Sequence, residues 1–203
     1  MFDLPKTSEI RKPLHKKLIY EKYAAELTGN KKDKFDADIS RIIITNEISE
    51  ASVNIKATEE ISAIFVLQVE LKRKEYDDKN IIMISKRFGQ KLLIVLHYEN
   101  VYQLAIYETR LLKSDWKSEK EISLKLNGLD LGRVWDNFVT QVSGIAVQAG
   151  NTLVEQINVE AEKEKLRKQI ADLELKARKE VQSKKKFEMV QRIQQYKERL
   201  KGI

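Results

Sequence analysis

The sequence contains no cysteine, and this absence excludes disulfides, thiol nucleophiles and thiolate zinc sites together. Histidine is also scarce, because His15 and His97 are the only two, too few for a histidine-rich metal site. No apolar run approaches the roughly 18 residues that a membrane-spanning helix needs, and the N-terminus shows no basic region followed by an apolar stretch. We therefore expect a cytoplasmic protein with no membrane segment.

The glycines and prolines are few, and their positions are informative. The seven glycines form neither G-x-x-x-x-G-K-[ST] nor G-x-G-x-x-G, which argues against an ATPase or a dinucleotide enzyme, and no G-x-S-x-G elbow supports a serine hydrolase. Both prolines precede Leu14, and no glycine lies between Gly150 and Gly202. Residues 151–203 are therefore predicted to form a helical extension after a body of residues 1–150. As one straight helix it would be roughly 75 Å long at about 1.5 Å per residue.

What the chain does have is a core-forming composition and a positive charge at both ends. Its 203 residues are 42% hydrophobic and 34% charged, which is typical of a folded protein. The net charge of +7 is uneven: residues 1–35 carry nine Lys/Arg and five Asp/Glu, residues 36–159 carry 15 and 18, and residues 160–203 carry 14 and eight. This pattern indicates polyanion contact through the termini, although solvated lysine-rich helices would look the same.

The hydrophobic pattern of residues 1–150 predicts an α+β fold with a mostly antiparallel sheet and packing helices. Strands are expected over 41–48, 61–72, 91–98 and 101–108, with a tight hairpin at Glu99-Asn100. A short strand or bridge is expected at 53–55, and a short strand at 122–126. Helices are expected over 14–27, 35–40, 77–88 and from Asp130 onward, the last with its apolar residues on one face. His97, near the end of an apolar strand, is expected to be a hydrogen-bonded edge residue.

Two short coiled-coil-like patterns occur in the extension. Leu166, Ile170, Leu173 and Ala177 recur at alternating spacings of four and three, as do Met189, Ile193, Tyr196 and Leu200. The register slips between them near Lys184–Lys186, so a helical hairpin and a straight rod remain alternatives.

One strand carries a weak nuclease-like signal. Glu70 and Lys72 lie two residues apart, so they share a face and resemble the E-x-K half of a PD-(D/E)xK site, in which a carboxylate pair binds Mg²⁺. Glu47 is the best candidate for the second acid, with Glu59 or Glu60 behind it. The simpler interpretation is that these residues are the solvated end of a half-buried strand. No cofactor is expected unless this nuclease interpretation holds.

Several stretches together resemble the bacterial family catalogued as domain of unknown function 4391. They include Leu4-Pro5, Ile42 to Ile55, Glu60 to Lys72, Leu92 to Leu96, Tyr102-Gln103-Leu104, Leu126 to Trp135, and Gln182 to Leu200. The chain departs from the family at Arg87-Phe88-Gly89, where members often have Ile-Pro-Tyr-like residues. The resemblance implies a gene context of helicases and DNA methyltransferases in restriction-like or phage-defence clusters, and it implies no catalytic residue.

Three functions follow as hypotheses. The leading one is a non-catalytic accessory or scaffold protein of a bacterial DNA-processing or phage-defence assembly, which docks a larger partner, such as a helicase or DNA methyltransferase, through its C-terminal helices. Non-specific DNA contact would come from basic residues of the extension: Lys163, Lys165, Arg167, Lys168, Lys184, Lys185 and Lys186. The alternatives are the Mg²⁺-dependent nuclease and a structural protein that forms a homodimer through the same extension.

Overall fold

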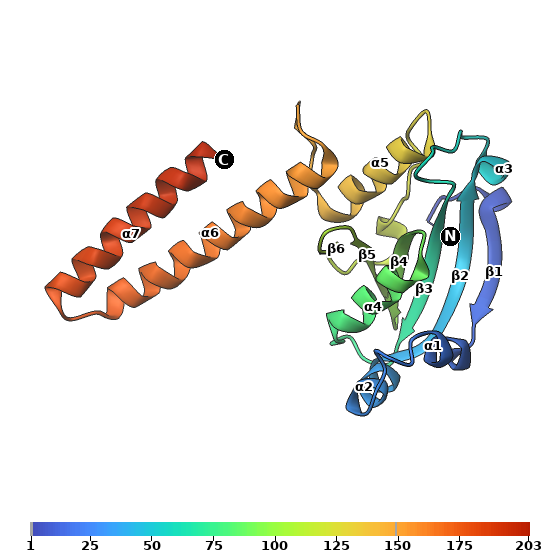
Figure 1. Ribbon diagram of the computed structural model, residues 1–203, viewed down its shortest axis with the longest axis horizontal. Coiled ribbons are helices and arrows are strands. Elements are labelled where there is room, and N and C mark those ends of the chain that lie inside the picture. The colour runs from blue at the N-terminus through green and yellow to red at the C-terminus, as the bar shows by residue number, and fades with distance from the viewer. Residues whose placement is uncertain (1, 149) are drawn as a thin grey trace. The chain divides into compact units, whose positions relative to one another are not determined.

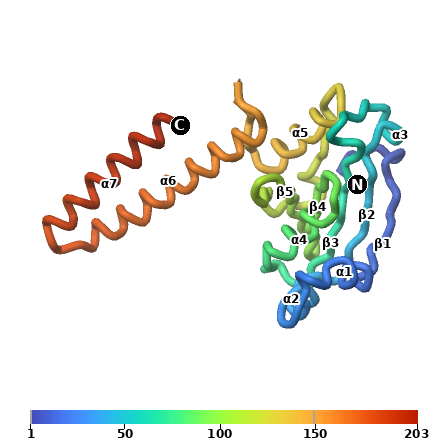
Figure 2. Tube along the Cα trace, viewed as in Figure 1, coloured from blue at the N-terminus to red at the C-terminus, as the bar shows by residue number. Residues whose placement is uncertain are grey.

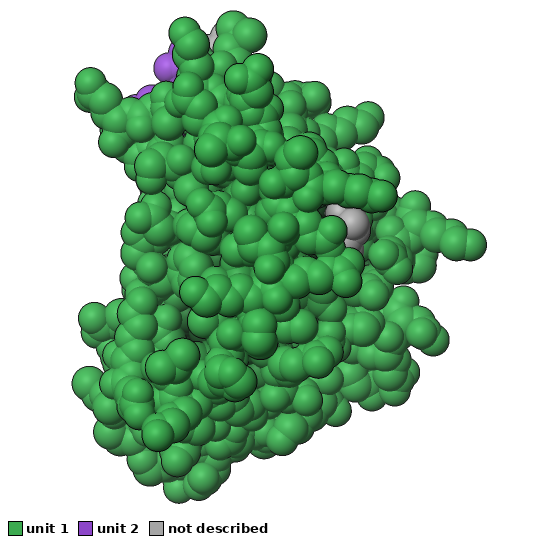
Figure 3. All heavy atoms as spheres, turned by 90° about the vertical axis from the view of Figure 1, so that its right-hand side faces the viewer, with its two compact units in different colours: residues 1–144 green, residues 145–203 purple. Residues whose placement is uncertain are grey.

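A computed structural model describes residues 2–148 and 150–203 of the chain. It divides into two compact units, residues 1–144 and residues 145–203, which are coloured separately in Figure 3. The sequence placed the end of the body after residue 150, whereas the first unit ends at Gly144, a residue in the left-handed conformation that ends the last helix of that unit.

A six-stranded sheet forms the centre of the first unit (Figure 1). Its strands lie in chain order, and every neighbouring pair is antiparallel except β3 and β4, which are parallel. The strands are β1 (Glu9–Leu14), β2 (Ile39–Ser49), β3 (Ala63–Leu71), β4 (Lys91–Tyr98), β5 (Val101–Tyr107) and β6 (Leu111–Lys113). The predicted α+β class, with a mostly antiparallel sheet, is confirmed.

Three helices cover one face of this sheet. They are α1 (Lys16–Lys22), α2 (Asn30–Asp38) and α4 (Asp78–Phe88), the last being the crossover between the two parallel strands. Ile19, Phe35 and Ile81 from these helices share one buried cluster with alternate residues of the strands, such as Leu67 and Ile94. Because alternate residues of a strand point to opposite faces, the residues between these buried ones lie on the other face of the sheet.

The opposite face is covered only in part. Helix α5 (Leu131–Ser143) packs against β3, β5 and β6 and buries Val134, Phe138 and Val142. The side chain of Asp130 accepts a hydrogen bond from the backbone N–H of Arg133, as an N-cap should. Two 3-10 turns (Lys6–Ser8 and Glu119–Glu121) and a short helix, α3 (Glu50–Val53), complete the unit.

The second unit is a helical hairpin. Helix α6 (Leu153–Lys179) and helix α7 (Ser183–Gly202) run side by side in opposite directions (Figure 2). Ile170, Ala177 and Ile193 form its buried cluster, with Leu173, Met189, Tyr196 and Leu200 packed around them. Of the two alternatives left by the sequence, the structure has the hairpin rather than the rod.

Two local predictions were wrong, and one strand was missed. Residues 50–53 form helix α3 instead of leading into a strand, because Ser49 and Ser52 complete a capping box and Asn54 adopts the left-handed conformation that ends the helix. Residues 122–126 lie outside any strand, and their alternating side chains of Ile122 and Leu124 are buried without strand pairing. Strand β1 was not foreseen, since Pro13 interrupts its pattern and is tolerated only at a sheet edge.

No helix within the described parts of the chain is long and apolar enough to cross a membrane.

Candidate functional site

A row of four polar side chains crosses the sheet on the face that α5 leaves open. Arg41 of β2 lies opposite Glu70 of β3, Glu70 lies beside His97 of β4, and His97 lies opposite Tyr102 of β5. The row passes the carboxyl ends of the two parallel strands. Ligands of open α/β sheets bind at such ends, so this row is the first place to look for a site.

The middle of the row is a connected hydrogen-bond network. Nδ1 of His97 lies 2.7 Å from Oε2 of Glu70, and Nε2 of Gln68 donates to Oε1 of Glu70 at 2.5 Å. The rings of His97 and Tyr102 stack with their centroids 4.3 Å apart and their planes 11° from parallel. Burial, and then the negative charges of Glu119 and Glu70, raise the pKa of the Tyr102 phenol above its ordinary value.

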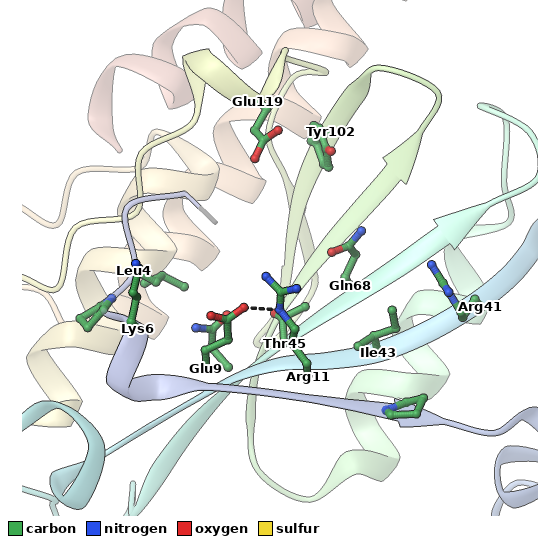
Figure 4. Close-up of a pocket in the computed structure, with 13 residues that line it drawn as sticks. Leu4, Lys6, Glu9, Arg11, Arg41, Ile43, Thr45, Gln68, Tyr102 and Glu119 are labelled. Atoms are coloured by element: carbon green, nitrogen blue, oxygen red, sulfur yellow. Dashed lines mark hydrogen bonds and ion pairs between the residues drawn. The ribbon is translucent and has the colours of Figure 1, made fainter.

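A cavity of about 670 Å³ adjoins this row (Figure 4). Its floor is formed by β2 and β3, including Ile43 and Gln68, and its walls come from the N-terminal segment, β1, and the region of Tyr102 and Glu119. The remaining lining residues are Leu4, Pro5, Lys6, Glu9, Arg11, Pro13, Arg41, Thr45 and Asn46. The size lies within the range of about 300–1,000 Å³ that is usual for small-molecule sites.

Two irregularities in strand pairing shape this cavity. The register of β2 shifts between Ile44 and Asn46, so the consecutive residues Thr45 and Asn46 both line the cavity instead of pointing to opposite faces. The pairing of β1 with β2 shifts between Glu9 and Lys12, and Arg11 in this bulge has a φ of 44°. Asn46 is buried and held by a hydrogen bond from its side-chain amide to Oγ of Ser8.

The structure does not bring the three residues of the nuclease hypothesis together. Glu47 lies opposite Phe65, five residues before Glu70 on β3, which places the two acids about 16 Å apart along the strand and on opposite faces. Lys72 follows β3, is exposed, and lies close enough to Asp36 for its charge to stabilise that carboxylate. Across the described ranges, no three His, Asp or Glu side chains are placed to hold a metal ion.

The structure divides the predicted DNA-contacting residues into two groups. Lys184, Lys185 and Lys186 begin α7 at the turn of the hairpin, while Lys163, Lys165, Arg167 and Lys168 lie in the first part of α6. Lys168 is 11 residues from the end of α6, or about 16 Å. In the group on α6, Lys163 forms an ion pair with Glu160, and its side chain is largely buried.

The hairpin turn collects more positive charge than the sequence alone suggested. Because α6 and α7 are antiparallel, the end of α6 lies next to the start of α7. This adds Lys176, Arg178 and Lys179 to Lys184–Lys186, against the single acid Glu180 between residues 176 and 186. We call these six basic residues the tip cluster.

Sequence reasoning missed most of the sheet site. His97 was expected at an edge, but β4 lies between β3 and β5, and its partner Glu70 is 27 residues away in the chain. Arg41 and Tyr102 gave no signal of their own, because only the strand register places them in line with Glu70. The alternating pattern of β3 did correctly place Glu70 on the polar face.

This combination defines an α+β protein with a mixed sheet, a polar site on its open face and a separate basic helical hairpin. The family described as "Domain of unknown function (DUF4391)" matches residues 2–200, and the chain belongs to this family. No curated protein and no solved structure matches the chain.

Proposed function

We propose that this protein is a non-catalytic accessory or scaffold protein of a bacterial DNA-processing or phage-defence assembly. In this proposal the hairpin docks a larger partner and contacts the DNA backbone without sequence preference. The tip cluster is the observation that carries it, since two helices converge to present six basic side chains and one acid over 11 residues. The gene context implied by the family resemblance suits a helicase or DNA methyltransferase as the partner.

The tip cluster has the properties of a phosphate-contacting surface. Lys184, Lys185 and Lys186 are exposed and form no ion pair among the described residues, whereas Lys197 and Arg199 further along α7 pair with Glu174 and Glu162 of α6. Lysines without carboxylate partners are free to replace counterions on a phosphate backbone, a contact that carries no sequence information.

The same end of the hairpin exposes apolar side chains that support protein docking. Phe187 and Val190 lie three residues apart on α7 and are 62% and 51% exposed, and Leu175 and Val181 are also exposed. Apolar residues surrounded by lysines fit an apolar groove with a carboxylate rim on the partner.

The DNA role is tested by reversing charge at the tip. Replacing Lys184, Lys185 and Lys186 with Glu should weaken retention of duplex DNA and flatten its dependence on salt, measured by gel shift at two salt concentrations. The matched control replaces Lys31, Lys32 and Lys34 of α2, which changes the charge equally in the first unit. Equal loss in both variants, or no loss in the tip variant, contradicts the phosphate role of the tip.

The docking role is tested with Phe187→Ser and Val190→Ser in the full chain. Co-purification with a helicase or methyltransferase encoded beside this protein should be lost, while DNA retention through the lysines is kept. The exposed apolar pair also favours self-association as a second candidate. If light scattering shows a dimer that these substitutions dissociate, and no partner binds, the hairpin is a dimerisation element instead.

A further inference from the structure

The cavity on the open sheet face has a cationic side and an acidic side. Lys6, Arg11 and Arg41 come from the N-terminal segment and the first two strands, where Glu9 is the single acid among them, and Glu119 comes from the opposite wall beside Tyr102. Figure 4 shows Arg11 and Arg41 near the strands of the floor, with Tyr102 and Glu119 together across the cavity. Such polarity selects a ligand that is anionic at one end and rich in N–H donors at the other.

The positive charge on the cationic side is mostly uncompensated. Within the described parts of the chain, no carboxylate oxygen lies within 4.0 Å of the charged nitrogens of Arg41 or Lys6. Arg11 pairs only with Glu9, the dashed contact in Figure 4, and its side chain is 77% exposed. Among the described residues, the Arg41 guanidinium is outside any internal ion pair, and Arg11 keeps its terminal N–H groups exposed while its Nε pairs with Glu9. Planar guanidinium donors of this kind match a phosphate in geometry.

The backbone at Arg11 determines where the Arg11 side chain lies. A φ of 44° is unfavourable for a residue with a Cβ, and it is maintained here by the bulge in β1. A bulge redirects a side chain, and this one places the Arg11 side chain over the cavity.

The rest of the lining narrows the ligand class. The opposite wall offers the carboxylate of Glu119, and the floor offers the amide oxygen of Gln68. Both groups can accept hydrogen bonds from the N–H donors of a base. Leu4, Pro5, Pro13 and Ile43 supply apolar surface for a planar ring. Since Tyr102 is already stacked on His97, base recognition here rests on edge hydrogen bonds rather than on stacking.

We propose that this cavity binds a nucleotide, with its phosphate between Arg11 and Arg41 and its base toward Glu119 and Gln68. The nucleotide is either a free mononucleotide or the terminal nucleotide of a nucleic-acid strand, because both present the same phosphate and base. This site is separate from the hairpin surface and does not depend on it.

The test measures binding of AMP, adenosine, inorganic phosphate and a short oligonucleotide with and without a 5′-phosphate to the full chain by calorimetry. Oligonucleotide binding is measured in the Lys184→Glu, Lys185→Glu, Lys186→Glu background, so that the hairpin does not contribute. AMP should bind about tenfold or more tightly than adenosine, and Arg41→Gln and Arg11→Gly should each weaken AMP binding about tenfold. Lys12→Gln, the same charge change on β1 but outside the cavity lining, should leave affinity within about twofold.

Each outcome decides the proposal. Arg11→Gly removes the unfavourable φ, so its urea midpoint should stay at or above that of the wild type, and weakened binding then reflects the lost guanidinium. Binding of the 5′-phosphorylated oligonucleotide but not of AMP, with the same arginine dependence, assigns the site to a strand terminus. Equal affinity for adenosine and AMP, insensitivity to both arginine substitutions, or no binding of any probe overturns the proposal, while leaving the hairpin proposal standing.

Discussion

At the residue scale, Asp38 is the buried charge that ties three elements together. It is the last residue of α2 and is fully buried. Its carboxylate accepts hydrogen bonds from Nε of Arg73 at 2.7 Å, from the backbone N–H of Asp77 at 2.9 Å and from Nδ2 of Asn80 at 2.9 Å. Its backbone carbonyl also accepts from the amide of Lys72. The carboxylate therefore joins the start of β2, the end of β3 and the start of α4.

Replacing Asp38 with Ala should lower the free energy of unfolding by about 3 kcal/mol, because Asn80 and the Asp77 amide would be left buried without an acceptor. The measurement is urea denaturation followed by circular dichroism. Asp33→Ala, also on α2 but exposed, is the control and should change stability by less than about 0.5 kcal/mol. A loss below about 1 kcal/mol for Asp38→Ala would show that the network is replaced by water.

The sequence could not reveal this network or the polar row. Asp38 meets Asn80 across 42 residues, and Glu70 meets His97 across 27. Both pairings depend on the strand register and on how α4 crosses between β3 and β4. The alternation along β3 predicts only which face of the sheet Glu70 occupies. In β2, the bulge at Thr45 moves the residues that follow it to the face opposite to the one that simple alternation predicts.

At the element scale, the hairpin rests on a narrow core. Ile193 of α7 packs with Ile170 and Ala177 of α6, and these are the three buried apolar residues of the cluster within the described part of the hairpin. Ile193→Ala should therefore destabilise the pairing of α6 and α7 by about 2 kcal/mol and raise amide exchange along α7. Val190→Ala, exposed on the same helix, should leave the exchange pattern of α7 unchanged. Equal exchange in both variants would show that Ile193 does not hold the helices together.

The hairpin should also weaken in acid. Hydrogen bonding and the charge of Lys197 lower the pKa of Glu174, and hydrogen bonds from the backbone N–H and side chain of Thr152 lower the pKa of Glu155 at the start of α6. A carboxyl whose pKa is lower when folded contributes stability above its unfolded-state pKa and loses it as the pH falls through the folded value. Helicity of the hairpin, measured by circular dichroism, should thus fall below about pH 4.5, and Glu174→Gln should reduce that pH dependence.

The elements themselves were largely predictable, and the exceptions have physical causes. The four long strands, α4, α5 and the helical extension follow from period-two and period-3.6 patterns that the tertiary structure did not override. Helix α3 was missed because its four residues bury no side chain fully, so the serine capping box decides its conformation. The sequence did not decide between a helical hairpin and a straight rod, because a slip in the hydrophobic register is compatible with both.

At the scale of the whole molecule, the distribution of charge limits how steeply DNA affinity can depend on salt. If the tip cluster makes all backbone contacts, six cations correspond to a slope of log K against log salt of no more than about −5 for duplex DNA. Filter binding between low and moderate salt measures this slope. A steeper value would assign further contacts to Lys163, Lys165, Arg167 and Lys168, and a slope near zero would remove the electrostatic interaction altogether.

Both margins of the sheet are unsuited to accepting another strand. On one side, β1 contains Pro13, which has no N–H to donate, and a bulge that breaks its ladder, and on the other side β6 is only three residues long. Copies of this protein should therefore resist edge-to-edge polymerisation into extended sheets, even at high protein concentration.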